Sequence, residues 1–189
     1  AIEAKIICNS KDLSCWIGNS IEYGNIWSDS VLLSECWKLN SNGLIEKIND
    51  LNLFATSLNQ SKERYNENLE QGKSFIKITR EVWKHEYISD ELIYPIAYAC
   101  SAFNESLSLE ETIISFLHNT SSNLIMAGMK LIPLGQTDGQ KILLEINEII
   151  SKKYLEVINS NINMIGTCGW ISDIISMRHE NQYTRLFRT

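Results

Sequence analysis

The sequence predicts an all-α protein, and three observations lead to this fold class. Apolar residues recur at about the 3.6-residue period of an amphipathic helix, and the strict alternation of a strand is nearly absent. Only two prolines, Pro95 and Pro133, occur in 189 residues, and clusters of turn-forming residues are sparse. We therefore expect a single domain over residues 1–189, an antiparallel bundle of roughly seven to nine helices joined by short loops.

The first three expected helices are short. Ser10 is the predicted cap of a helix that ends at Gly24. A second helix covers residues 29–39, and a shorter one follows near residues 44–58. Each is expected to bury one apolar side against its neighbours.

The fourth expected helix, residues 62–87, is long and charged. Its predicted apolar side consists of Tyr65, Leu69, Phe75, Ile76, Val82 and Trp83. Gly72 interrupts it, and a glycine inside a helix costs about 1 kcal/mol relative to alanine. Two explanations stay open: drift without consequence, or the close approach of another helix that a side chain would block.

The second half of the chain predicts four more helices. Pro95 suits the first turn of a helix that runs to residue 103. A capping-box pattern opens a helix over residues 108–131, whose nearly all-round apolar surface predicts a place at the centre of the bundle. A second capping box starts a helix over residues 137–159, and a short helix is expected near residues 171–177.

Composition excludes several classes of protein. With 44% hydrophobic and 21% charged residues, the chain is expected to be folded and not disordered. The net charge of -6 repels phosphate, which disfavours nucleic acids and anionic membrane surfaces as partners. No run of apolar residues is long enough to span a bilayer, so no membrane segment is expected.

The cysteines favour a reducing, cytoplasmic setting. Cys8, Cys15, Cys36, Cys100 and Cys168 are an odd number, are widely spread, and include no C-x-x-C pair. A disulfide framework is therefore not expected. Cys15 and Cys36 lie among large apolar residues at helical spacing, which predicts that both are small core residues.

No residue pattern predicts an enzyme or a metal site. The three histidines, His85, His118 and His179, match no metal-binding spacing, and no nucleophile elbow occurs. His118 is predicted to be a core or subsurface residue of the helix that carries it. The paired carboxylates at residues 90–91 and 110–111 are interpreted as helix starts, where they favour the helix dipole.

The glycine-rich stretch over residues 135–139 opens a helix, and a helix N-terminus can hold an anion. It lacks the lysine and serine of a P-loop, and Asp138 would repel phosphate. A structural turn with a cap, or a docking surface, is the preferred interpretation over a nucleotide site.

The last thirteen residues, 177–189, differ from the acidic body. They contain Arg178, His179, Tyr183, Arg185, Phe187 and Arg188. Arginine and aromatic residues dominate the energetics of protein interfaces, whereas a frayed terminus has no physical need of Leu186 or Phe187. We therefore predict that this C-terminal tail docks onto a partner.

Two stretches carry a family resemblance. Residues 131–140, LIPLGQTDGQ, and residues 178–189, RHENQYTRLFRT, resemble the signatures of the urease accessory protein UreF family. Residues 71–73, residues 94–98 and the opening residues 2–4 fit the same family in order. The resemblance covers essentially the whole chain. The N-terminal segment that is usual in the family is missing here, so the contribution of that segment to docking is in doubt.

The resemblance implies a urease maturation factor that is not itself an enzyme. Members of the family are all-helical and dimerise, and they bind the accessory protein UreH, called UreD in many systems, and through it the GTPase UreG. That assembly delivers nickel to apo-urease, and the UreF-like subunit is thought to regulate the GTPase. The nickel is handled by the complex, and no cofactor of the subunit itself is expected.

By matched position, the resemblance places partner binding in the tail and in the turn that would lie beside it. The tail residues are Arg178, His179, Gln182, Tyr183, Arg185, Leu186, Phe187 and Arg188, and the turn residues are Gly135, Gln136, Thr137 and Asp138. Two alternatives stay open: a nickel carrier using His179, Cys168 or His118 as ligands, and a hydrolase with Cys–His chemistry.

Overall fold

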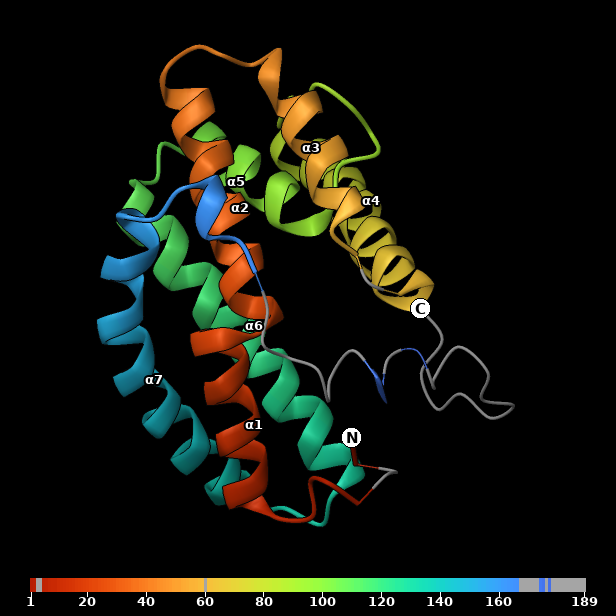
Figure 1. Ribbon diagram of the computed structural model, residues 1–189, viewed down its shortest axis with the longest axis vertical. Helices are drawn as coiled ribbons and strands as arrows, with labels where there is room; N and C mark the ends of the chain where they lie inside the picture. The colour runs from red at the N-terminus through yellow and green to blue at the C-terminus, as the bar shows by residue number, and fades with distance from the viewer. Residues whose placement is uncertain (3–4, 60, 167–173, 176, 178–189) are drawn as a thin grey trace. The chain divides into compact units, whose positions relative to one another are not determined.

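The computed structural model describes residues 1–2, 5–59, 61–166, 174–175 and 177. This part of the chain contains seven α-helices, one 3-10 helix and no strand, so the all-α prediction is confirmed (Figure 1). It forms two compact units, one built from residues 1–31 and the described part of 110–169, the other from residues 32–109 and the described part of 170–189. We call them unit 1 and unit 2. The expectation of a single domain over the whole chain stays a prediction.

Seven of the predicted helices are present, with shifted ends. They are α1 (Ser10–Tyr23), α2 (Asn25–Ser41), α3 (Lys47–Ser57), α4 (Lys62–Trp83), α5 (Tyr94–Asn104), α6 (Leu109–Leu131) and α7 (Gln136–Ile158), followed by the 3-10 helix η1 (Ile162–Met164). The helix predicted near residues 171–177 falls mostly outside the described residues. None of the described helices is long and apolar enough to cross a membrane.

The caps explain two of the shifted boundaries. Asn9, and not Ser10, caps α1: its side-chain oxygen accepts a hydrogen bond of 2.9 Å from the Asp12 N–H. Helix α4 stops at Trp83, four residues earlier than predicted, because Lys84 adopts a left-handed conformation with φ 60°.

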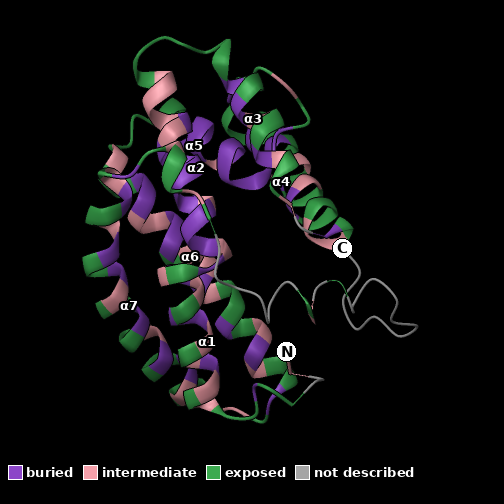
Figure 2. Ribbon diagram, viewed as in Figure 1, coloured by how far each residue is buried: buried purple, intermediate pink, exposed green. Residues whose placement is uncertain are grey.

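Unit 1 is held together by the packing of α1 against α7, and Leu13 of α1 lies close to Gly128 of α6. Ile17 and Ile21 of α1 are fully buried, as is Ile146 of α7, and buried positions follow the facing sides of these helices (Figure 2). At the surface of the same contact, the Ser14 hydroxyl donates a hydrogen bond of 2.5 Å to the Glu145 carboxylate.

The burial predicted for α6 is found only in its first half. Phe116 and Leu117 are completely buried there. In the second half Leu124, Met126 and Leu131 are 37%, 53% and 39% exposed, so the nearly all-round burial predicted from its composition is wrong. Helix α6 therefore buries one side along its length and leaves apolar surface exposed near its C-terminal end.

In unit 2, α4 lies very close to the start of α5 at Gly72. A Cβ atom at Gly72 would overlap the carbonyl oxygen of Leu92 and lie 2.9 Å from the amide nitrogen of Tyr94. The Asn52 side chain fixes the same segment, because it donates to the Glu91 carbonyl and accepts from the Ile93 N–H, both at 3.0 Å. The predicted close approach at this glycine is confirmed, but the neighbour is the segment that leads into α5 and not the body of another helix.

The buried side of α4 differs from the predicted apolar side. Of the six residues predicted there, only Ile76 is buried, and Tyr65, Val82 and Trp83 are 38%, 62% and 57% exposed. The residues that α4 does bury are Asn68, Gly72, Ile76 and Thr79. They lie at helical spacing, but three of the four are polar or small, so hydrophobicity does not mark this face.

Candidate functional site

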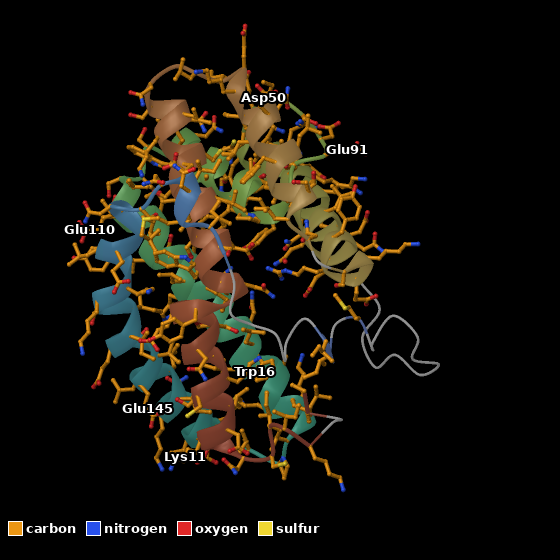
Figure 3. All side chains as sticks on the ribbon, in the orientation of Figure 1. Lys11, Trp16, Asp50, Glu91, Glu110 and Glu145 are labelled. Carbon is orange, nitrogen blue, oxygen red and sulfur yellow. The ribbon has the colours of Figure 1, made fainter. Side chains whose placement is uncertain are left out.

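The predicted partner-binding site has two parts, of which the structure describes one. The tail residues lie outside the described residues: Arg178, His179, Gln182, Tyr183, Arg185, Leu186, Phe187 and Arg188. The described part is the turn between α6 and α7 in unit 1. Figure 1 shows this turn at the end of unit 1 where α1 begins, and Lys11 and Glu145 mark the lower parts of α1 and α7 in Figure 3.

The turn is fixed by its own backbone and by one carboxylate. Gly135 precedes the first residue of α7, and its N–H donates to Asp138 Oδ2 at 3.2 Å. The Gly135 carbonyl accepts from the Asp138 and Gly139 N–H groups, each at 3.1 Å. Gly135 and Asp138 therefore form the cap. The capping residue, Gly135, lies two positions before the predicted start at Thr137.

A close contact beneath the turn holds it against α6. A Cβ atom at Gly139 would overlap the sulfur of Met129 and lie 3.5 Å from Ile125 Cγ2. Above this contact Gly135, Gln136 and Thr137 are exposed and Asp138 is half-buried. The α6–α7 turn thus presents two uncharged polar side chains on a hydrogen-bonded backbone, and its one carboxylate already serves the helix start.

A buried polar cluster in unit 2 was not predicted from the sequence. His85 is 6% exposed; its Nδ1 lies 2.9 Å from Ser101 Oγ and its Nε2 lies 2.6 Å from Glu105 Oε1. Tyr87, two residues further, shares a 2.6 Å hydrogen bond with Thr79. The only available signal was the helical spacing of Ser101 and Glu105, which is too common to identify such a cluster.

The composition of this cluster matches a hydrolytic triad, but its placement does not suit that chemistry. Ser101 is 8% exposed and His85 is 6% exposed, so a substrate as large as an ester or a peptide cannot reach the hydroxyl. The hydroxyl and both ring nitrogens are occupied by partners within the fold. The cluster therefore ties the loop after α4 to α5.

A charged groove runs along α4 beside the segment before α5, where Figure 3 labels Glu91. It has a volume of about 490 Å³ and is lined by Lys73, Ile76, Lys77, Arg80, Glu81, Asp90 and Glu91. Asp90 pairs with Arg80 at 2.6 Å, and Glu91 pairs with Lys73 at 3.0 Å. The prediction that residues 90–91 start a helix is wrong, because these carboxylates cross-link a loop to α4.

Three single-residue predictions have different outcomes. Cys36 is fully buried, as predicted, but Cys15 is exposed because it lies on the outer side of α1. His118 is also exposed, so its prediction as a core or subsurface residue is wrong. In the described residues, no three His, Cys, Asp or Glu side chains gather as a metal site would require.

Comparison with known proteins gives a consistent result. A family model described as UreF matches residues 7–147. A protein of Rhodopseudomonas palustris (strain HaA2) named urease accessory protein UreF is 32% identical over 196 residues, covering 100% of this chain and 83% of that protein. Proteins of the same name from Bradyrhizobium sp. (strain BTAi1) and Trichormus variabilis are 30% and 28% identical to this chain. Both alignments cover 100% of this chain, and they cover 81% and 84% of the two relatives, respectively.

Proposed function

Because this chain belongs to the UreF family, we propose that it is a urease maturation factor that helps to load nickel into apo-urease and catalyses no reaction itself. The observation that carries the proposal is similarity to urease accessory proteins along the whole chain. The chain acts as a scaffold in the cytoplasm, as a homodimer, together with UreH (UreD) and the GTPase UreG.

The α6–α7 turn supports a docking role within this proposal. Gln136 and Thr137 stand on a backbone that is already fixed by the Gly135–Asp138 hydrogen bonds and by the contact of Gly139 with α6. A partner that binds a preformed surface loses less conformational entropy than one that must order a loop. The turn then contributes a rigid contact, and the tail contributes the arginine and aromatic anchors.

In this proposal nickel passes through the assembled complex, and this subunit shapes the assembly and regulates the GTPase. The competing idea, a nickel carrier, requires a tight site on the chain itself. Equilibrium dialysis of the isolated chain against nickel separates the two: the scaffold proposal expects no stoichiometric retention at low micromolar nickel, and tight retention would favour the carrier.

Reconstitution of urease activation tests the function. Apo-urease is incubated with nickel, GTP, UreH (UreD) and UreG, with and without this chain, and urea hydrolysis is then measured. We expect activation to depend on the chain, and the chain alone to hydrolyse neither urea nor GTP. Equal activation without the chain would contradict the proposal.

A matched pair of variants tests the turn. Thr137→Arg places a long cation in the exposed turn, and Asn147→Arg places the same side chain on an exposed position of α7 away from it. We expect Thr137→Arg to reduce capture of the partner complex and Asn147→Arg to leave it unchanged, with equal helical circular dichroism. Equal capture by both variants would remove the turn from the docking surface.

A further inference from the structure

Unit 2 contains two cysteines whose sulfur atoms touch in the core. Cys36 on α2 and Cys100 on α5 are 0% and 6% exposed, and their Sγ atoms are 3.7 Å apart. Both are free thiols. They belong to different helices and are separated by 64 positions in the sequence, so tertiary packing and not local spacing brings them together.

Polar groups around the pair give its two thiols different roles. Asn40 Nδ2 lies 3.7 Å from both sulfur atoms, and the Cys36 thiol faces the Ile96 carbonyl at 3.7 Å. The hydrogen bond to Cys100, followed by burial, raises the pKa of the Cys36 thiol. The hydrogen bond with Cys36 lowers the pKa of Cys100 against the opposing effect of burial, and the hydrogen bond with Asn40 lowers it further. Either thiol can donate the hydrogen bond between them, and the lowered pKa of Cys100 makes it the better nucleophile.

We propose that Cys36 and Cys100 form an oxidation site, at which a small peroxide converts the thiol pair into a disulfide that links α2 to α5. The Cys100 thiolate attacks one peroxide oxygen, the O–O bond breaks, and a sulfenic acid and hydroxide form. The Cys36 sulfur then attacks the Cys100 sulfur, the S–O bond breaks, and hydroxide leaves with the thiol proton as water. In sum, two thiols and one hydrogen peroxide give one disulfide and two waters.

The geometry and the polarity of the site suit this reaction. The sulfur atoms must approach from 3.7 Å to the disulfide length of about 2.05 Å, a movement within the range of side-chain rotation. Only Cys100 has any exposed surface, so it meets the oxidant first, and its low exposure excludes bulky disulfide reagents. The product is uncharged, so the core that disfavours a Cys36 thiolate does not oppose the disulfide.

The disulfide would close a loop that contains α3 and α4. Cross-linking a long loop restricts the unfolded chain and stabilises the fold by an amount that raises the Tm of a chain of this size by about 4 to 16 °C. Oxidation would therefore stiffen unit 2 and leave its helices in place. This inference is independent of the proposed function in urease maturation.

The test uses the full chain with Cys8, Cys15 and Cys168 replaced by serine, so that only the pair remains. The folded protein is treated with hydrogen peroxide, digested, and analysed by mass spectrometry, and thiols are counted after unfolding. We expect a Cys36–Cys100 linked peptide, the loss of two hydrogen atoms, no free thiol, and a Tm increase that dithiothreitol reverses.

Two single variants in the same background give the order of the steps. With Cys36→Ala, Cys100 should stop at a sulfenic acid that dimedone traps; with Cys100→Ala, Cys36 should remain a free thiol at the same dose. The dose of peroxide is the one that oxidises the exposed Cys8 and Cys15 of the natural chain. If Cys36 and Cys100 both remain free thiols at this dose, the proposal is overturned. That readout needs no substitution in the core, so it stands even if an alanine variant fails to fold.

Discussion

Single residues decide several of the contacts in this protein, and Gly72 is the clearest case. Its missing side chain lets the backbone of α4 meet the carbonyl of Leu92 directly. A glycine at this position lowers helix propensity by about 1 kcal/mol relative to alanine, and it makes that contact possible. The neighbour is a backbone segment that Asn52 holds in place, so it cannot yield as the end of a flexible side chain would.

Gly72→Ala should therefore destabilise the protein, although alanine is the better helix former. We expect a net loss of about 1 to 2 kcal/mol in the free energy of unfolding, because overpacking against the backbone, at up to about 3 kcal/mol, outweighs the gain of about 1 kcal/mol in propensity. Urea denaturation measures it. Ser74→Ala, at an exposed position of the same helix, is the control and should change stability by less than about 0.5 kcal/mol. Equal effects would mean that the contact yields without cost.

Tyr87 provides a prediction about pH. Partial burial raises its pKa, against the opposing effect of the hydrogen bond with Thr79. A tyrosine with a raised folded-state pKa releases its proton more readily when unfolded, so its contribution to stability is present below pH of about 10 and is lost as pH rises. Tyr87→Phe should lose about 1 kcal/mol at neutral pH and show a less steep fall in unfolding free energy above pH of about 10. An unchanged alkaline slope in urea titrations would contradict this assignment.

At the scale of whole helices, several boundaries could be predicted from the sequence, whereas the buried face of α4 could not. Pro95 at the start of α5, the capping pattern before α6 and Gly24 after α1 act locally, and the predicted boundaries there agree with the structure. The contact face of α4 was missed because Asn68 and Thr79 become buried only through partners outside the helix, such as Asn59 and Tyr87. Periodicity reports apolar side chains and not the neighbours that bury polar ones.

Two glycine substitutions in and after α4 should affect stability differently. Lys84 adopts φ 60°, a conformation that costs a residue with a side chain about 1 kcal/mol and costs glycine little. Lys84→Gly should leave stability unchanged or raise it by up to about 1 kcal/mol. Lys77→Gly, inside the same helix, should lower stability by about 1 kcal/mol. Thermal unfolding of both variants measures the difference, and a loss for Lys84→Gly as large as that for Lys77→Gly would refute the left-handed cap.

On the scale of the whole molecule, the candidate site was only partly accessible from sequence. The α6–α7 turn was located correctly because glycine, proline and aspartate specify turns locally, although its cap lies two residues earlier than predicted. The buried cluster at His85 and the thiol pair of Cys36 and Cys100 depend on helices meeting across unit 2, which spacing along the chain does not encode. The role of the tail stays a prediction from composition and family resemblance.

If the tail docks onto a partner, its residues should differ in how much they contribute to binding. Phe187→Ala should weaken binding to UreH (UreD) by about 2 kcal/mol or more, roughly thirty-fold in Kd, because it removes an aromatic anchor. Thr189→Ala, two residues further, should change Kd by less than about three-fold. Titration calorimetry with each variant measures both constants, and similar losses would count against Phe187 as an anchor.

Docking through the tail is tested by the affinity of the partner complex for the chain with and without its last eight residues. UreH (UreD) and UreG are titrated into the full chain and into a version that ends at Asn181, while circular dichroism monitors the helical body. Truncation should abolish binding and leave the helical signal unchanged. Undiminished affinity in the truncated chain would contradict it, because partner docking would then not depend on the tail.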